Sequence, residues 1–93
     1  MHEEALLREL CARVDAVARE HGLVRVVRVR LWVGALSHLE DDAARSRWAE
    51  IARGTRGSGA ALEITRSTDL EDPRAQTVVL LDLVGDDGAP PPD

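Results

Sequence analysis

Hydrophobic residues near the N-terminus recur at helical spacing. Glu3 and Glu4 fall where a first turn would lie, and negative charge there suits the helix dipole. Gly22 follows the pattern as a helix stop. We therefore expect an amphipathic helix over 3–21, whose apolar stripe consists of Leu6, Leu7, Leu10, Val14, Val17 and Ala18.

The next segment, 23–33, alternates in the manner of a β-strand. One face would carry Val27, Val29, Leu31 and Val33, and the other Arg28, Arg30 and Trp32. We expect the valine face to meet the helices. The arginine face would be partly solvated, with Trp32 either packed at a sheet edge or marking a surface for an acidic protein partner.

A second helix is predicted after Gly34. Ser37 and Glu40 have the spacing of a capping box, with Ser37 as N-cap, and the helix would run from there to about Arg53. Its inner stripe would be Leu39, Ala43, Ala44, Trp48, Ile51 and Ala52.

Two further strands are predicted at 60–66 and 76–84, joined by a short turn over 67–75. The order helix, strand, helix, strand, strand indicates an α+β fold of two layers. It would have a three-stranded mixed sheet with both helices on one face, a parallel pair around the second helix, and an antiparallel pair between the last two strands. We expect a single domain over 1–84 and a flexible, acidic, proline-rich tail over 85–93.

Composition narrows the function. The chain has 93 residues, 17 acidic and 12 basic, and a net charge of −5. This balance argues against nucleic-acid binding, and no apolar run is long enough to span a membrane. No secretory signal is visible, so a cytoplasmic location is expected. No set of nucleophile, base and orienting group stands out, so an enzyme is not predicted.

A single cysteine excludes an internal disulfide and a multi-thiolate zinc site within one chain. Cys11 lies beside the apolar stripe of the first helix, where a lone cysteine usually behaves as a small buried hydrophobe.

The first residues offer nitrogen donors for a metal ion. Because His2 is large, we expect Met1 to be retained, which leaves a free α-amine beside the backbone nitrogen and imidazole of His2. Such a set suits Ni(II) or Cu(II), which favour square-planar nitrogen ligation. Binding would displace protons and should weaken in acid.

The same residues resemble the start of the HypA family, the nickel metallochaperones of [NiFe]-hydrogenase and sometimes urease maturation. The resemblance continues through a strand-and-turn pattern close to V-x-x-V-x-L-x-V-G-E-L-S, with Ala35 in place of the usual acidic residue. It covers residues 1 to about 66 well, and 76–84 more loosely. The segments that carry the resemblance are Met1-His2-Glu3, 25–37, 52–55 and 59–64.

One departure from the family is large. Its members carry two Cys-x-x-Cys pairs in a zinc domain between the last two strands, whereas here only 67–75 lies there, without cysteine. The resemblance therefore implies the nickel-binding domain without the zinc domain, and no structural zinc is expected within one chain.

The resemblance also implies a ligand set for Ni(II). His2 matches the principal ligand, Met1 and Glu3 supply accompanying donors, and Glu40 aligns with an acidic position near the nickel site in some members. Glu40 has an alternative role in the capping box. His38 is either an additional ligand or an exposed residue in the first turn of the second helix. His21, at the end of the first helix, is expected to have a structural role.

Two functions follow. In the first, the chain is a nickel-binding accessory protein that delivers Ni(II) by ligand exchange to a maturation GTPase of the HypB type or to a hydrogenase large-subunit precursor. In the second, it is a zinc-less docking module that binds a hydrogenase subunit or maturation factor without delivering metal. The apolar strand 76–84, if it lies at a sheet edge, also offers a surface for a homodimer.

Overall fold

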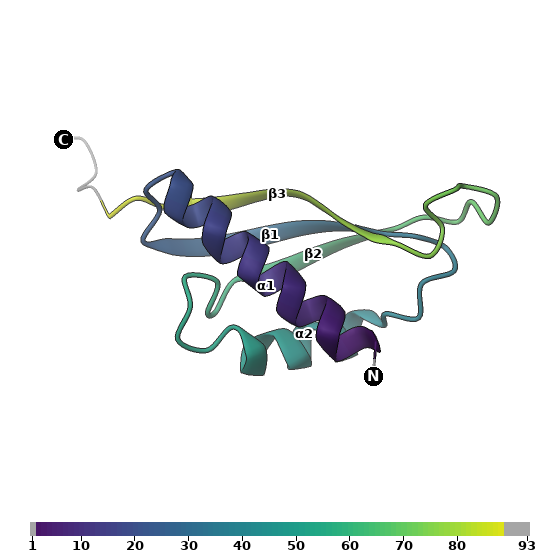
Figure 1. The fold of residues 1–93 in the computed structure, drawn as a ribbon, viewed down its shortest axis with the longest axis horizontal. Helices are drawn as coiled ribbons and strands as arrows, with labels where there is room; N and C mark the ends of the chain where they lie inside the picture. The colour runs from purple at the N-terminus through teal and green to yellow at the C-terminus, as the bar shows by residue number, and fades with distance from the viewer. Residues whose placement is uncertain (1, 89–93) are drawn as a thin grey trace.

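The predicted element order is the order that the structure has. The computed structural model describes residues 2–88, with side chains from Glu4 onward, and Figure 1 shows both helices on one face of the sheet. The sheet order is β2-β1-β3, with β1 parallel to β2 and antiparallel to β3. The α+β prediction is thus confirmed. The elements are α1 (His2–Glu20), β1 (Arg25–Val33), α2 (Asp41–Ile51), β2 (Ala61–Arg66) and β3 (Val78–Asp86).

The core lies between the helix layer and the sheet. Trp48 of α2 is its largest buried side chain, and the indole Nε1 donates a hydrogen bond to the carbonyl oxygen of Gly57 at 3.1 Å. The predicted stripe of α2 is right for Ala44 and Trp48 but wrong for Ala43, which is exposed. The other large contributors are Leu7, Leu10, Val14, Val26, Val29, Leu31 and Val33.

The inner face of β1 differs from the prediction at one position. Val26 is buried, whereas Val27, which was expected to face the helices, is 48% exposed. The register against β3 shifts between Val26 and Arg28, so Val27 is an extra residue in β1 with no partner opposite. A bulge of this kind interrupts strict alternation, which explains the error.

The last strand also differs from the prediction. β3 pairs with β1 and not with β2, so the expected antiparallel pair between the last two strands is wrong. β3 runs to Asp86, two residues into the segment that was expected to be tail. The rest of that prediction, over 89–93, lies outside the described residues.

The start of α2 corrects the capping prediction. The N-cap is Glu40 and not Ser37, and no side chain caps this helix end. Ser37 Oγ instead accepts a hydrogen bond from the Leu39 N–H at 3.3 Å, a local turn that competes with a helical cap. His38 and Glu40 therefore precede the helix. α2 ends at Ile51, two residues before the predicted Arg53.

Residue 34 must be a glycine because the backbone at Ala75 passes too close to leave room for a Cβ atom. A Cβ at this position would lie 2.2 Å from the carbonyl oxygen of Ala75. The Gly34 N–H donates to the carbonyl oxygen of Thr77 at 2.9 Å, and the Leu36 N–H donates to the carbonyl oxygen of Ala75 at 2.7 Å. These bonds extend the β1–β3 ribbon beyond the sheet and fix where the turn before α2 begins.

Candidate metal centre

Two of the predicted nickel ligands, His2 and Glu3, belong to the first turn of α1. α1 begins at His2, and the first backbone N–H groups of a helix have no acceptor within it. Met1 and the side chains of His2 and Glu3 lie outside the described residues, so their assignment as ligands stays a prediction.

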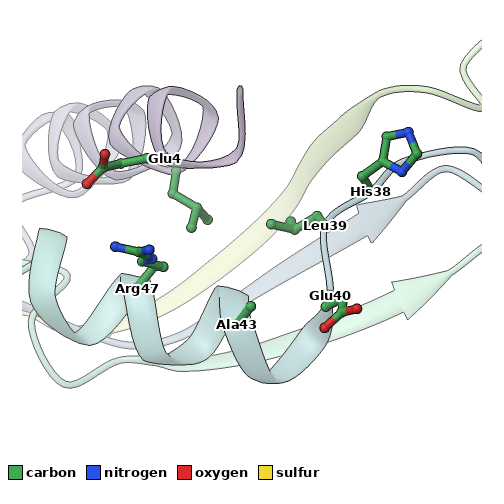
Figure 2. Close-up of a pocket in the computed structure, with 7 residues that line it drawn as sticks. Glu4, His38, Leu39, Glu40, Ala43 and Arg47 are labelled. Atoms are coloured by element: carbon green, nitrogen blue, oxygen red, sulfur yellow. The ribbon is translucent and has the colours of Figure 1, made fainter. Parts of the chain in front are cut away.

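A hollow of about 400 Å³ lies beside this end of α1. It is formed between α1, the turn before α2, and α2 itself, as Figure 2 shows. Buried Leu7 and Leu39 make its floor apolar, while charged and polar side chains surround it. The lining residues are Glu4, Leu7, His38, Leu39, Glu40, Ala43 and Arg47.

The hollow brings together two of the predicted site residues. His38 and Glu40 are both exposed and line the hollow together with Glu4. Because Glu40 makes no side-chain cap bond, its carboxylate is not used to begin the helix. In the described part of the chain, however, no three His, Cys, Asp or Glu side chains are grouped closely enough to hold a metal ion.

Arg66 of β2 anchors the turn that carries these residues. Its guanidinium donates to the Leu39 carbonyl oxygen and to Asp41 Oδ1, the latter at 3.1 Å. Together with the buried side chain of Leu39, this bond ties the turn to the sheet. The positions of His38 and Glu40 therefore depend on the sheet as well as on α2.

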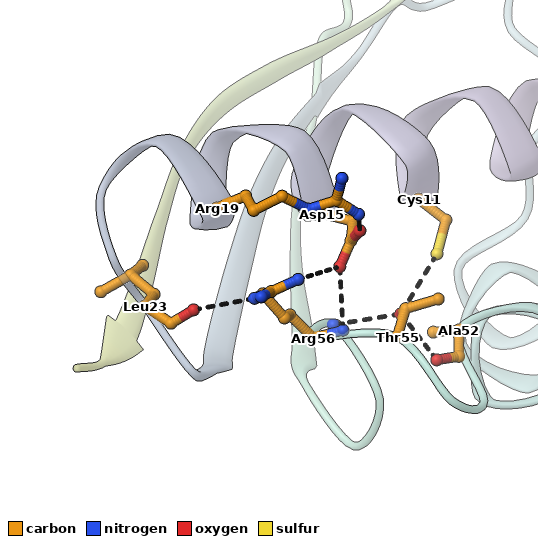
Figure 3. A network of polar contacts seen from close by, with 8 residues as sticks. Cys11, Asp15, Arg19, Leu23, Ala52, Thr55 and Arg56 are labelled. Atoms are coloured by element: carbon orange, nitrogen blue, oxygen red, sulfur yellow. Dashed lines mark hydrogen bonds and ion pairs between the residues drawn. The ribbon is translucent and has the colours of Figure 1, made fainter. Parts of the chain in front are cut away.

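A polar network, which sequence reasoning missed, joins the middle of α1 to the loop after α2 (Figure 3). Asp15 accepts a hydrogen bond from the Arg56 N–H at 3.1 Å and forms ion pairs with Arg19 and Arg56 at 2.6 and 3.7 Å. Arg56 Nε in turn donates to the carbonyl oxygen of Leu23 at 3.1 Å. The only signal in the sequence was the spacing of Asp15 and Arg19, which suits a pair within one helix.

This network lowers the pKa of Asp15. The main cause is the hydrogen bond from the Arg56 backbone N–H to the carboxylate, which favours its charged form. Partial burial opposes the shift, and the two arginine side chains add to it.

The remaining candidates have structural roles or are distant from the hollow. Cys11 is buried, as predicted, with its Sγ 3.7 Å from Thr55 Oγ1. His21 is exposed just after α1. A helix of 19 residues separates it from His2 by about 28 Å.

On the face of the sheet that the helices leave uncovered, the arginine charges are largely neutralised by acidic side chains of neighbouring strands. Arg28 pairs with Glu63 and Arg30 with Asp82, both at 3.1 Å. The guanidinium of Arg74 lies 4.7 Å from the centre of the Trp32 ring. The arginines that suggested an acidic partner are thus engaged within the chain.

Comparison with known proteins identifies the family. The family model described as "Hydrogenase/urease nickel incorporation, metallochaperone, hypA" matches residues 1–70. The chain belongs to the HypA family. The predicted resemblance is thereby confirmed over this range, which includes α1, the turn before α2, and β2.

Individual HypA relatives agree. The chain is 41% identical over 66 residues to the hydrogenase maturation factor HypA of Rhizobium leguminosarum bv. viciae, a match that covers 71% of this chain and 58% of the relative. HypA of Methylocella silvestris is 39% identical, covering 69% and 57%. HypA of Beijerinckia indica subsp. indica is 36% identical over 89 residues, covering 88% and 74%.

The chain spans less than three fifths of the length of the first two relatives. In the part of the chain that the structure describes, neither helix is long and apolar enough to cross a bilayer.

Proposed function

We propose that this HypA-family chain carries Ni(II) at its N-terminal end and passes it on during maturation of a nickel enzyme such as [NiFe]-hydrogenase. The observation that carries the proposal is the family match from residue 1, which includes Met1-His2-Glu3. The family description names nickel incorporation as its role.

The backbone at the start of α1 supports this ligand set. Since the first N–H groups of the helix have no internal acceptor, the amide nitrogens of His2 and Glu3 can lose a proton without breaking a helical hydrogen bond. With the Met1 amine and the His2 imidazole they make a nitrogen-rich set of the kind that Ni(II) accepts in a plane.

The adjacent hollow supports transfer. Glu40 and His38 line it and are exposed, so each can act as an incoming ligand while the N-terminal donors leave one at a time. Glu40 is the better candidate because its carboxylate does not cap α2. The recipient in this proposal is a maturation GTPase of the HypB type or a hydrogenase large-subunit precursor.

A free α-amine is the most specific requirement of the proposal. The experiment compares nickel affinity, by calorimetry, of the untagged chain and of the same chain acetylated at the amine, with intact mass establishing that Met1 is present. Acetylation removes one donor, so a loss of affinity of at least about tenfold is expected. Equal affinities would overturn the proposed ligand set.

A further inference from the structure

Most arginines of this chain are held by acidic side chains. Its 12 basic residues are all arginines, and nine of them form ion pairs. The side chains of Arg13, Arg47 and Arg53 have no ion pair and no hydrogen bond with any residue that the structure describes. Of these three, Arg47 borders the hollow between α1 and α2.

The two carboxylates that line the hollow do not neutralise Arg47. Glu4 forms its ion pair with Arg8, in the next turn of α1, at 3.4 Å. Glu40 precedes Arg47 by seven residues, which is about 10 Å along a helix, and Figure 2 shows the two at opposite ends of the hollow. Arg47 is therefore a cationic group that no anion in the described part of the chain engages.

The middle of the hollow is apolar. Buried Leu7 and Leu39 form its floor, and Ala43 borders it from α2. Ala43 is exposed and lies four residues before Arg47, so the two share one face of the helix. Because the alanine side chain is a single methyl group, it leaves the hollow open, and a volume of about 400 Å³ can receive an aliphatic side chain.

An aliphatic side chain next to a carboxylate in one segment would complement both features. The aliphatic group would cover the apolar floor, and the carboxylate would accept hydrogen bonds from the Arg47 guanidinium, a strong charge-assisted contact. A purely apolar segment would desolvate the guanidinium without giving it an acceptor, and a basic segment would add like charge. Since His38, Ala43 and Arg47 are exposed, a longer chain can lie across the hollow.

We propose that this hollow docks a partner protein through a segment that carries an aliphatic side chain, such as leucine, beside an aspartate or glutamate whose carboxylate Arg47 binds. The inference rests on the proposed function in one respect, since the partner would be the nickel recipient, which this contact would hold beside the start of α1. The contact itself needs no nickel, so it is tested on the metal-free chain.

NMR titration of the metal-free full chain with capped hexapeptides tests the proposal. The probe is Gly-Ser-Leu-Asp-Ser-Gly, and a counterpart with Asn in place of Asp removes only the charge. The Leu-Asp peptide should shift the amide signals of residues that line the hollow, with a Kd on the order of 1 mM. The Leu-Asn peptide should bind at least about tenfold more weakly.

Two results of this titration would overturn the proposal. One is the absence of any shift in these signals at about 10 mM Leu-Asp peptide, and the other is equal affinity for the two peptides. Neither result bears on the N-terminal ligand set, which is titrated separately with nickel, so the two proposals can fail independently.

Substitutions with matched controls locate the contact. Arg47→Gln should weaken binding of the Leu-Asp peptide at least about tenfold. Arg53→Gln removes an equally unpaired guanidinium just after α2 and should leave the affinity unchanged. Ala43→Leu fills the hollow and should also weaken binding, whereas Ala49→Leu adds the same group at an exposed alanine of α2 outside the hollow. Equal effects of a substitution and its control would overturn the proposal.

Sedimentation velocity shows whether the chain supplies the docking segment itself. Leu70 is 64% exposed between Asp69 and Glu71, but Asp69 Oδ1 accepts the Glu71 N–H at 3.0 Å, which bends this segment into a turn. We therefore expect the chain to be monomeric at the concentration of the NMR titration. Self-association that Arg47→Gln abolishes would assign the hollow to a second copy and overturn the assignment to a different partner.

Discussion

At the scale of single residues, Asp15 holds three parts of the chain together. Its carboxylate accepts a hydrogen bond from the Arg56 backbone N–H and forms ion pairs with the guanidinium groups of Arg19 and Arg56. The Arg56 side chain in turn donates to the carbonyl oxygen of Leu23, within the connection between α1 and β1. These contacts of Asp15 fix the position of α1 relative to the loop after α2. They therefore also contribute to the geometry of the hollow, which lies at the other end of the two helices.

Replacing Asp15 should destabilise the fold. The Asp15→Asn variant keeps an acceptor but loses the charge, and we expect a loss of about 1–2 kcal/mol in the free energy of unfolding by urea. Asp42→Asn is the control, because Asp42 is fully exposed and its nearest ion-pair contact to Arg45 is 3.9 Å. Its effect should be about 0.5 kcal/mol or less, and equal losses would refute the special role of Asp15.

The lowered pKa of Asp15 also predicts an acid response. A carboxyl whose pKa is lower in the folded than in the unfolded chain contributes stability above its unfolded pKa, and this contribution is lost as pH falls through the folded pKa. Urea unfolding as a function of pH should therefore show a weaker acid loss in Asp15→Asn than in the wild-type chain. The loss should not vanish, because the Arg74 N–H and guanidinium lower the pKa of Asp72 in the same direction.

At the scale of elements, the start of α2 decides what Glu40 is free to do. Since Glu40 occupies the N-cap without a side-chain cap bond, Glu40→Ser should stabilise the chain by about 0.5–1 kcal/mol in thermal or urea unfolding. Ser37→Ala should change stability by about 0.5 kcal/mol or less. A large loss of stability in Ser37→Ala would indicate that Ser37 caps α2, as the capping box predicted and the structure contradicts.

The ribbon beyond the sheet depends on Gly34. Gly34→Ala places a methyl group against the Ala75 backbone. We therefore expect the free energy of unfolding by urea to fall by about 1–3 kcal/mol or more. Gly54→Ala is a comparison in which the new Cβ meets nothing and only the positive φ of 83° is strained. The Gly54 variant should lose about 1–2 kcal/mol, and a smaller loss in Gly34→Ala than in Gly54→Ala would contradict the close approach.

Local patterns predicted every element, and the crossover preference predicted the parallel pair of β1 and β2, but the partner of β3 was not predicted. Helical spacing, alternation and Gly22 sufficed for α1 and β1, and Gly22 does have the left-handed φ of 68°. The bulge at Val27, the pairing of β3 with β1, and the Asp15 bonds all depend on contacts between residues far apart in the chain. The Ser37–Glu40 spacing was misleading because Ser37 bonds to the nearer Leu39 N–H.

At the scale of the whole molecule, the proposed metal site lies where α1, the turn before α2 and α2 meet. The start of α1 is well separated from the C-terminal end of β3 along the long axis of the molecule (Figure 1). The family resemblance of the first residues predicted His2 as a ligand, and the structure adds the hollow with His38 and Glu40 beside it. No sequence pattern indicated this hollow, since it forms where α1 and the turn before α2 meet.

The most direct test of the nickel-carrier proposal is calorimetric titration of the untagged chain with Ni(II), alongside His2→Ala and His21→Ala. Each substitution removes one imidazole, but His21 lies about 28 Å from His2, at the far end of α1. We predict a single strong site that is weakened at least about a hundredfold in His2→Ala and unchanged in His21→Ala. Equal nickel affinity of the wild-type chain and His2→Ala would contradict the N-terminal site.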